Sequence, residues 1–112
     1  MILTAPFCSY THFAPYHYAT GLSRYWYETI LPQYGFEIQS IEADGNFCEF
    51  LAQAIWAFSR SYANMYSSYK ISEQEMVDVD KVLHLISRIN EVDKGSEELC
   101  CFGWLVVAKR IR

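Results

Sequence analysis

The sequence predicts an α/β fold with about three strands and about three helices. Segments typical of strands stand at the start, the middle and the end of the chain, at residues 1–6, 36–41 and 99–108. Amphipathic patterns typical of helices fill the intervals between them, at residues 24–33, 47–69 and 73–92. This alternation of strands and helices is typical of a sheet that is covered by helices.

The first strand, Met1 to Pro6, is short and apolar, and it ends at Pro6 because proline cannot donate to a strand ladder. A loop is expected from there to Leu22. Pro15 keeps the residue before it out of helical geometry, and Gly21 permits a turn. The loop therefore connects a strand to a helix.

Ser23 stands at the N-cap position of a helix that is expected from Arg24 to Gln33. Apolar residues three or four positions apart give this helix one inward face, made of Tyr27, Ile30, Leu31 and Tyr34. Gly35 stands where helices commonly end. The next stretch, Phe36 to Ile41, alternates apolar and polar residues, which predicts a half-buried strand.

Residues 46–94 are expected to form a pair of long helices. An apolar stripe with steps of three or four runs from Phe47 to Tyr69, and further apolar residues widen it. This first helix is therefore expected to be covered over much of its surface. Ser72 and Glu75 match a capping box that opens the second helix, which is expected to run to about Val92.

The last strand, Leu99 to Ala108, is almost wholly apolar. A strand of this kind fits the centre of a sheet, where both of its faces are covered. Cys100 and Cys101 are adjacent, so they are expected to point to opposite faces of this strand.

Length and composition limit the classes of protein and of partner. A chain of 112 residues is expected to form one domain at most. The net charge is −4 and no run of Lys or Arg is present, so nucleic acid is not expected as a partner. No apolar stretch approaches the length of a membrane span, so no membrane association is expected. The four cysteines form no CxxC pair and no secretory signal is visible, which favours reduced thiols and a cytoplasmic location.

The segment from Thr11 to Glu28 is the strongest candidate for a site, because it combines two histidines with six aromatic residues and an arginine. A histidine there could act as a general base or hold a polar group. The candidate catalytic residues are His12 and His17, and the candidate substrate-binding residues are Tyr16, Tyr18, Arg24 and Tyr25. The alternative interpretation is a surface loop whose rings pack back onto the core.

Two other kinds of chemistry are weaker hypotheses at this segment. Cys8, His12 and His17 are residue types that bind zinc, but no fourth ligand is evident and their spacing matches no common site. A nucleophilic pair of Cys8 with either histidine lacks a recognisable orienting residue. No metal site is therefore expected.

Four phrases of the sequence are familiar in combination. They are Ile2–Phe7, His12-x-x-Pro15, Ser23–Tyr27 and Leu31–Ile38. Together they resemble the C-terminal half of class I S-adenosylmethionine-dependent methyltransferases, in the branch called methyltransferase type 11. In that family a loop with His and Pro follows the fifth strand, and a helix then leads to a Gly-Phe-x-Ile phrase that opens the sixth. A final antiparallel strand inserts between those two, and Leu99 to Lys109 suits that place.

The resemblance implies that the chain is the C-terminal portion of a Rossmann-like methyltransferase sheet, with its last strand antiparallel and central. Residues 1–112 would form a single partial domain, in which residues 46–94 are a helical elaboration. The whole enzyme would transfer a methyl group from S-adenosylmethionine to a small-molecule acceptor. This chain would shape the acceptor pocket, with His12 or His17 as a possible base.

The family's cofactor motifs would all precede Met1, so no cofactor-binding residue can be assigned. The isolated chain is therefore expected to bind no S-adenosylmethionine and to be inactive, and whether it is an enzyme stays open. Its expected partner is the missing N-terminal half. The alternative hypothesis is a non-catalytic interaction module, which homodimerises or completes a partner through an exposed strand edge.

Overall fold

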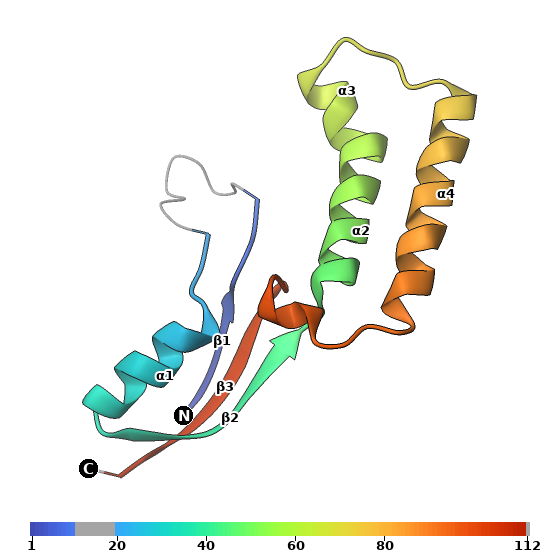
Figure 1. Cartoon of the computed structure of the whole chain (residues 1–112). Coiled ribbons are helices and arrows are strands. Elements are labelled where there is room, and N and C mark those ends of the chain that lie inside the picture. The colour runs from blue at the N-terminus through green and yellow to red at the C-terminus, as the bar shows by residue number, and fades with distance from the viewer. Residues whose placement is uncertain (11–19, 112) are drawn as a thin grey trace. The chain divides into compact units, whose positions relative to one another are not determined.

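The computed structural model describes residues 1–10 and 20–111 and contains a three-stranded sheet and several helices (Figure 1). Two compact units divide the chain. The sheet unit comprises Met1–Asn46 and Glu97–Arg112, and the helical unit comprises Phe47–Ser96. The α/β class predicted from the sequence is confirmed.

The sheet consists of β1 (Ile2–Pro6), β2 (Phe36–Asp44) and β3 (Gly103–Arg110). Their order is β1-β3-β2, and β3 is antiparallel to both neighbours. The strands β1 and β2 therefore run parallel to each other on either side of β3 (Figure 1). The predicted position of the last strand, central and antiparallel, is confirmed.

The start of β3 differs from the prediction. The sequence predicts this strand from Leu99, but it begins at Gly103, after a short 3-10 helix at Ser96–Glu98. The first apolar residues of the run complete the turn into the sheet instead, and Cys101 among them is fully buried in the core. An apolar run alone does not distinguish a buried turn from a strand.

The helix α1 (Arg24–Gln33) supplies the second layer of the sheet unit. Tyr27 and Leu31 of α1 are buried, as predicted, and pack with inward-facing residues of β3. The core cluster consists of Tyr27, Leu31, Cys101, Trp104, Val106 and Ala108. The prediction that Tyr34 faces inward is wrong: it is 72% exposed, because it lies beyond the last turn and caps the helix through its backbone N–H.

The helical unit contains α2 (Phe47–Ala57), a π-helical turn (Phe58–Tyr62), α3 (Ala63–Tyr66) and α4 (Glu73–Asn90). The single helix that the sequence predicts from Phe47 to Tyr69 is therefore interrupted, and it ends at Tyr66. The predicted capping box is confirmed: Glu75 N donates to Ser72 Oγ, and Ser72 N donates to Glu75 Oε1, both at 3.1 Å.

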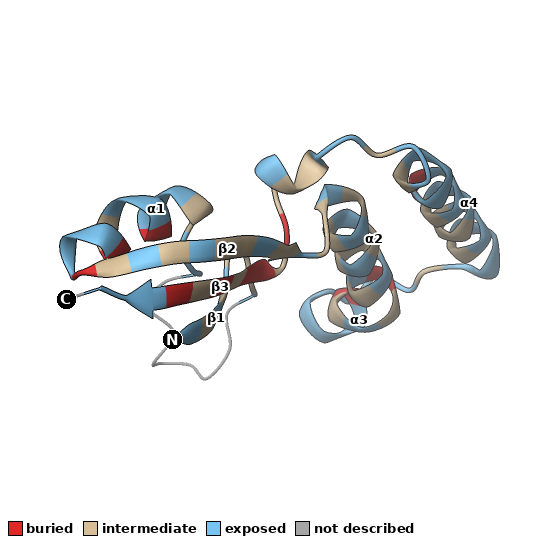
Figure 2. Cartoon of the chain, turned by 90° about the horizontal axis from the view of Figure 1, so that it is seen from below, coloured by how far each residue is buried: buried red, intermediate tan, exposed pale blue. Residues whose placement is uncertain are grey.

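Burial in the helical unit is much lower than the sequence predicts. All of its residues are described, and those that are buried are Ser59, Ala63 and Ile86. The helix α2 contains no buried residue, although its wide apolar stripe predicts extensive cover (Figure 2). In this unit α2 packs along α4 alone, and one neighbour can cover one stripe only.

Candidate functional site

The carboxyl ends of β1 and β2 meet the beginning of α1 at one edge of the sheet. Pro6 and Asp44, at the ends of the two parallel strands, both pair with Gly103. Leu22 N donates to Pro6 O at 3.2 Å, which fixes the chain just before α1 to the end of β1. Ligands of open α/β sheets bind outside this edge. The candidate residues Arg24 and Tyr25 stand in the first turn of α1 beside it.

Arg24 is held by two carboxylates and by an aromatic ring. Its Nε and Nη2 donate to Glu28 Oε1 at 3.1 and 2.8 Å, and its Nη1 donates to Glu98 Oε1 at 3.1 Å. The guanidinium carbon lies 5.8 Å from the ring centroid of Trp104. The hydrogen bonds that Arg24 donates to Glu28 and the charges of both carboxylates raise the pKa of Arg24, against a lowering by burial. Arg24 is therefore charged and oriented.

Tyr25 shares a carboxylate with Arg24. Its hydroxyl donates to Glu98 Oε2 at 2.8 Å, and this hydrogen bond is the largest cause of the raised pKa of Tyr25. We call Arg24, Tyr25, Glu28 and Glu98 the Glu98 cluster. The structure thus brings together the two described candidates, and it adds Glu98, which the sequence analysis missed. No pattern in the sequence links Glu98 to residues more than seventy positions earlier.

The Glu98 cluster can serve two purposes. Its hydrogen bonds tie the first turn of α1 to the segment that enters β3, which is a structural role. Tyr25 is nevertheless largely exposed, so its phenol and the adjacent guanidinium and carboxylate can also meet a polar ligand group. The arrangement offers both donors and acceptors within one small surface.

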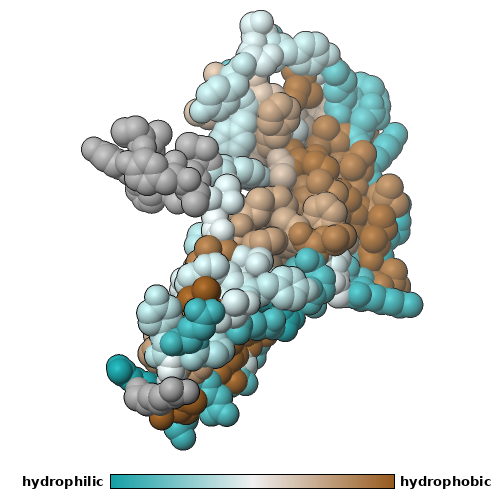
Figure 3. All heavy atoms as spheres, turned by 60° about the vertical axis from the view of Figure 1, so that its left-hand side comes forward, coloured by the Kyte–Doolittle hydropathy of each residue, from teal (hydrophilic) through white to brown (hydrophobic). Residues whose placement is uncertain are grey.

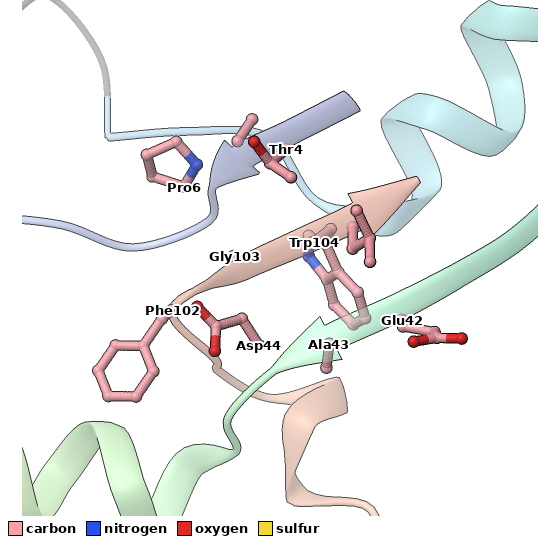
Figure 4. A pocket seen from close by; sticks show the side chains of 10 residues that line it. Thr4, Pro6, Glu42, Ala43, Asp44, Phe102, Gly103 and Trp104 are labelled. Carbon is pink, nitrogen blue, oxygen red and sulfur yellow. The ribbon is translucent and has the colours of Figure 1, made fainter. Parts of the chain in front are cut away.

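A hollow of about 530 Å³ opens at the same edge of the sheet. Its walls are Thr4–Pro6 of β1, Glu42–Asp44 of β2 and residues 102–105 around the start of β3. Figure 4 shows the carboxylates of Glu42 and Asp44 on the β2 side and Thr4 with Pro6 on the β1 side. Ligand sites commonly occupy about 300–1,000 Å³. The hollow is thus large enough for a small molecule.

Two polar atoms in the core beneath this edge have no hydrogen-bond partner among the described residues. They are Trp104 Nε1 and the hydroxyl of Tyr27. Burial raises the pKa of Tyr27, so its hydroxyl stays protonated at neutral pH. An unpaired buried donor costs about 1–3 kcal/mol. Trp104 also lines the hollow and lies under the guanidinium of Arg24, so it connects the core with the candidate site.

Three cysteines also lie at this edge. Cys101 is buried, and its thiol donates to Gly103 O at 3.2 Å. Burial is the largest cause that raises the pKa of Cys101, to about 11. Cys100 is half-buried, and its pKa is raised first by burial and then by the nearby Cys8. Both thiols are therefore protonated at neutral pH.

The other candidate residues, His12, Tyr16, His17 and Tyr18, lie outside the described residues. A metal site at Cys8 with the two histidines is not tested either, because both histidines lie outside the described residues. Within residues 1–10 and 20–111 no cluster of three or more metal-binding side chains occurs. No helix in this part of the chain has the length and apolar character that a membrane span requires.

No protein-family model, curated protein or solved structure matches this chain. The resemblance to methyltransferases therefore stays a prediction. What supports a functional assignment is the order and direction of the strands, together with the polar residues and the hollow at the carboxyl edge of the sheet.

Proposed function

We propose that the chain forms the acceptor side of an S-adenosylmethionine-dependent methyltransferase and shapes a pocket for a small-molecule methyl acceptor. The observation that carries this proposal is the strand order β1-β3-β2, with β3 antiparallel at the centre. The resemblance requires this order of the fifth, seventh and sixth strands of the family. A further feature in common with the family is the helix α1, which connects the parallel strands β1 and β2. Connections between parallel strands of one sheet are crossovers of this kind.

The residues at the sheet edge give the proposal its chemistry. The phenol of Tyr25 and the guanidinium of Arg24 would contact a polar group of the acceptor, while Glu98 keeps both in place. His12 or His17 would take the proton of the acceptor's nucleophile, and Tyr16 and Tyr18 would complete the wall. Methyl transfer is a direct displacement that depends mainly on positioning the acceptor in line with the methyl group.

The cofactor would be held elsewhere, by a second segment or a second chain. The five glycines of this sequence are isolated, so no glycine-rich turn can cradle the cofactor. Among the described residues β1 has β3 as its single strand neighbour, so its other edge is open to a further strand. We propose that this assembly is cytoplasmic, since all four cysteines are free thiols and a reducing compartment keeps thiols reduced at rest.

Two titrations test this proposal. Calorimetry with S-adenosylmethionine should give no binding by the chain alone, and micromolar affinity would contradict a cofactor site located elsewhere. Amide NMR spectra with a panel of small phenols, amines and carboxylic acids should show shifts at the Glu98 cluster and the hollow. Tyr25→Phe should weaken the shifts, whereas Tyr34→Phe, at the far end of α1, should not. Shifts that avoid the sheet edge would contradict the acceptor site.

A second candidate function is self-association, and the exposed apolar rows of the helical unit favour it. Figure 3 shows apolar side chains gathered over this unit. Along the second half of α4 and just beyond its end, a row recurs at steps of three and four and is 45% to 71% exposed: Val82, Leu85, Ile89 and Val92. A corresponding row on α2 and the π-helical turn includes Phe47, Leu51 and Phe58. This spacing is the one by which helices pack along each other.

The occupant that fits these rows is the helical unit of a second copy. Two such pairs of helices would form a four-helix layer in which each row meets another helix. With side chains of up to about 200 Å² each, the exposed parts of the rows amount to several hundred Å². A specific interface buries about 800 Å² per partner, so the rows could supply most of it.

Light scattering during gel filtration separates this function from the first. The chain should be a dimer at micromolar concentration, and Leu85→Glu should convert it into a monomer without loss of helix content. Ser87→Glu, which lies on a different side of α4, is the matched control and should remain dimeric. A wild-type chain that is monomeric at all concentrations would exclude self-association, and it would leave the acceptor-side proposal untouched.

A further inference from the structure

The proposed functions make no use of the cysteines, although three of the four lie at the carboxyl edge of the sheet. The ladder between β1 and β3 continues for one pair beyond Pro6 and Gly103, because Phe7 N donates to Phe102 O at 2.9 Å. Cys8 follows directly on one side of this open end, and Cys101 and Cys100 precede it on the other. The strand register thus places two thiol-bearing segments against each other.

The two adjacent cysteines have different surroundings. Cys101 is fully buried among core residues, and its thiol donates a hydrogen bond to the carbonyl oxygen of Gly103. The thiol of Cys100 is half-buried and lies 3.9 Å from the carbonyl of Cys101. The charge and the hydrogen bonding of Cys8 act on Cys100 and add to the effect of burial in raising its pKa. Cys8 is therefore the neighbour of Cys100.

We propose that Cys8 and Cys100 are a redox-sensitive pair, which forms a disulfide across the open end of the β1–β3 ladder on reaction with a small disulfide such as oxidised glutathione. The thiolate of Cys8 attacks one sulfur of glutathione disulfide and releases the first glutathione as a thiolate. The thiolate of Cys100 then attacks the Cys8 sulfur of this mixed disulfide and releases the second glutathione. Two protein S–H bonds and one S–S bond are lost, and one protein S–S bond and two glutathione thiols are formed.

The disulfide would restrain both flanks of the candidate site. Cys100 comes two residues after Glu98, which holds Arg24 and Tyr25. Cys8 precedes the segment that contains His12 and His17 by a few residues. In a reducing compartment a disulfide of this kind is transient and reports the redox state. The inference depends on the register and the neighbouring thiols, so it stands whether or not the methyltransferase proposal holds.

Oxidation of the native chain tests the pair. After treatment with oxidised glutathione and acid quenching, two of the four thiols should resist alkylation, and the intact mass should fall by two hydrogen atoms. Peptide mapping should recover a crosslink between Cys8 and Cys100. Because the bond closes a loop of about ninety residues, the midpoint of thermal unfolding should rise by roughly 10 °C and return on reduction.

Single variants identify the pair. Cys48→Ser should retain the crosslink and the thermal shift, whereas Cys8→Ser should lose both. Cys100→Ser should accumulate glutathione on Cys8 as a stable mixed disulfide. Four alkylatable thiols after oxidation would overturn the proposal, and so would a mapped bond from Cys8 or Cys100 to Cys101. The wild-type map decides the question even if a variant fails to fold.

Discussion

The sheet unit buries a core cluster of apolar side chains between α1 and one face of β3, whereas the helical unit has no such cluster and leaves most of its large apolar side chains exposed. The difference follows from the number of neighbours that each element has. The strand β3 has a strand on either side and a helix on one face. Each long helix of the helical unit has a single helix beside it within that unit. The apolar surplus of α2 and α4 is therefore a property of the arrangement and requires a partner to be covered.

Substitution of a glycine should give the largest difference in stability loss between the two units. A Cβ at Gly103 would lie 2.4 Å from Ala5 O, so Gly103→Ala must push β1 and β3 apart. Its unfolding free energy should fall by about 3 kcal/mol in urea titrations. Gly95→Ala in the helical unit is the matched control, since no described atom lies within 4 Å of its added Cβ. There the positive φ alone should cost about 1 kcal/mol. Equal losses would mean that β1 does not approach Gly103 closely.

The same Val→Ala substitution in each unit should show how the difference in burial affects stability. Val106 of β3 is 0% exposed and Val82 of α4 is 45% exposed. Val106→Ala should lower the unfolding free energy by about 2–3 kcal/mol, because it removes two buried methyl groups and leaves a cavity. Val82→Ala should change the free energy of unfolding of the monomer by less than about 0.5 kcal/mol. A large effect at Val82 at low protein concentration would show that its row is covered within one chain.

At the helix N-caps the larger loss of stability should fall in the helical unit, which is the reverse of the order expected for the glycines and the valines. Ser72 accepts a hydrogen bond from Glu75 N in the capping box of α4, whereas the side chain of Ser23 makes no cap hydrogen bond to a described residue. Ser72→Ala should therefore lower stability by about 1 kcal/mol, and Ser23→Ala should have little effect. Circular dichroism during urea unfolding measures both. A similar loss at Ser23 would mean that its hydroxyl does cap α1.

The two serines also show which features of the fold are predictable from the sequence. Helix bounds and the capping box depend on residues within one or two turns, so the sequence predicts α1 and the start of α4 correctly. The central place of β3 follows from its apolar character on both faces. The π-helical turn and the start of β3 were not predictable, because an apolar run does not reveal where its geometry changes.

The candidate site was less predictable than the fold. Arg24 and Tyr25 stand out in the sequence by type and by position, but their partner Glu98 lies more than seventy residues away. The same holds for Cys8 and Cys100, which lie in the two segments that meet at the open end of the β1–β3 ladder. Contacts between distant segments depend on the packing of the whole unit, and no local pattern carries them.

Two tyrosine–glutamate pairs, one in each unit, allow the smallest test. Tyr25 donates to Glu98 at 2.8 Å across distant segments, and Tyr69 donates to Glu75 at 2.7 Å within a short one. Each hydrogen bond is the largest cause of a raised tyrosine pKa, and the second also lowers the pKa of Glu75. A tyrosine whose pKa is higher in the folded than in the unfolded state stabilises the folded protein below about pH 10. This contribution is lost as the pH rises through the folded-state pKa. The lowered pKa of Glu75 stabilises above its ordinary value of 4.5 and is lost as pH falls.

Titration of the individual phenols, followed by NMR of the carbon-13-labelled tyrosine rings, should distinguish these pairs. Glu98→Gln should move the pKa of Tyr25 down toward 10 and leave that of Tyr69 unchanged, and Glu75→Gln should do the reverse. In moderate urea the pKa of Tyr25 should fall as the sheet unit unfolds, because only the folded sheet unit brings Glu98 close to Tyr25. Tyr69 and Glu75 should remain coupled for as long as the start of α4 is helical. If Tyr25 instead keeps its raised pKa in Glu98→Gln, then Glu98 does not hold the candidate site, and the residue that positions Tyr25 for an acceptor must be sought elsewhere on the sheet edge.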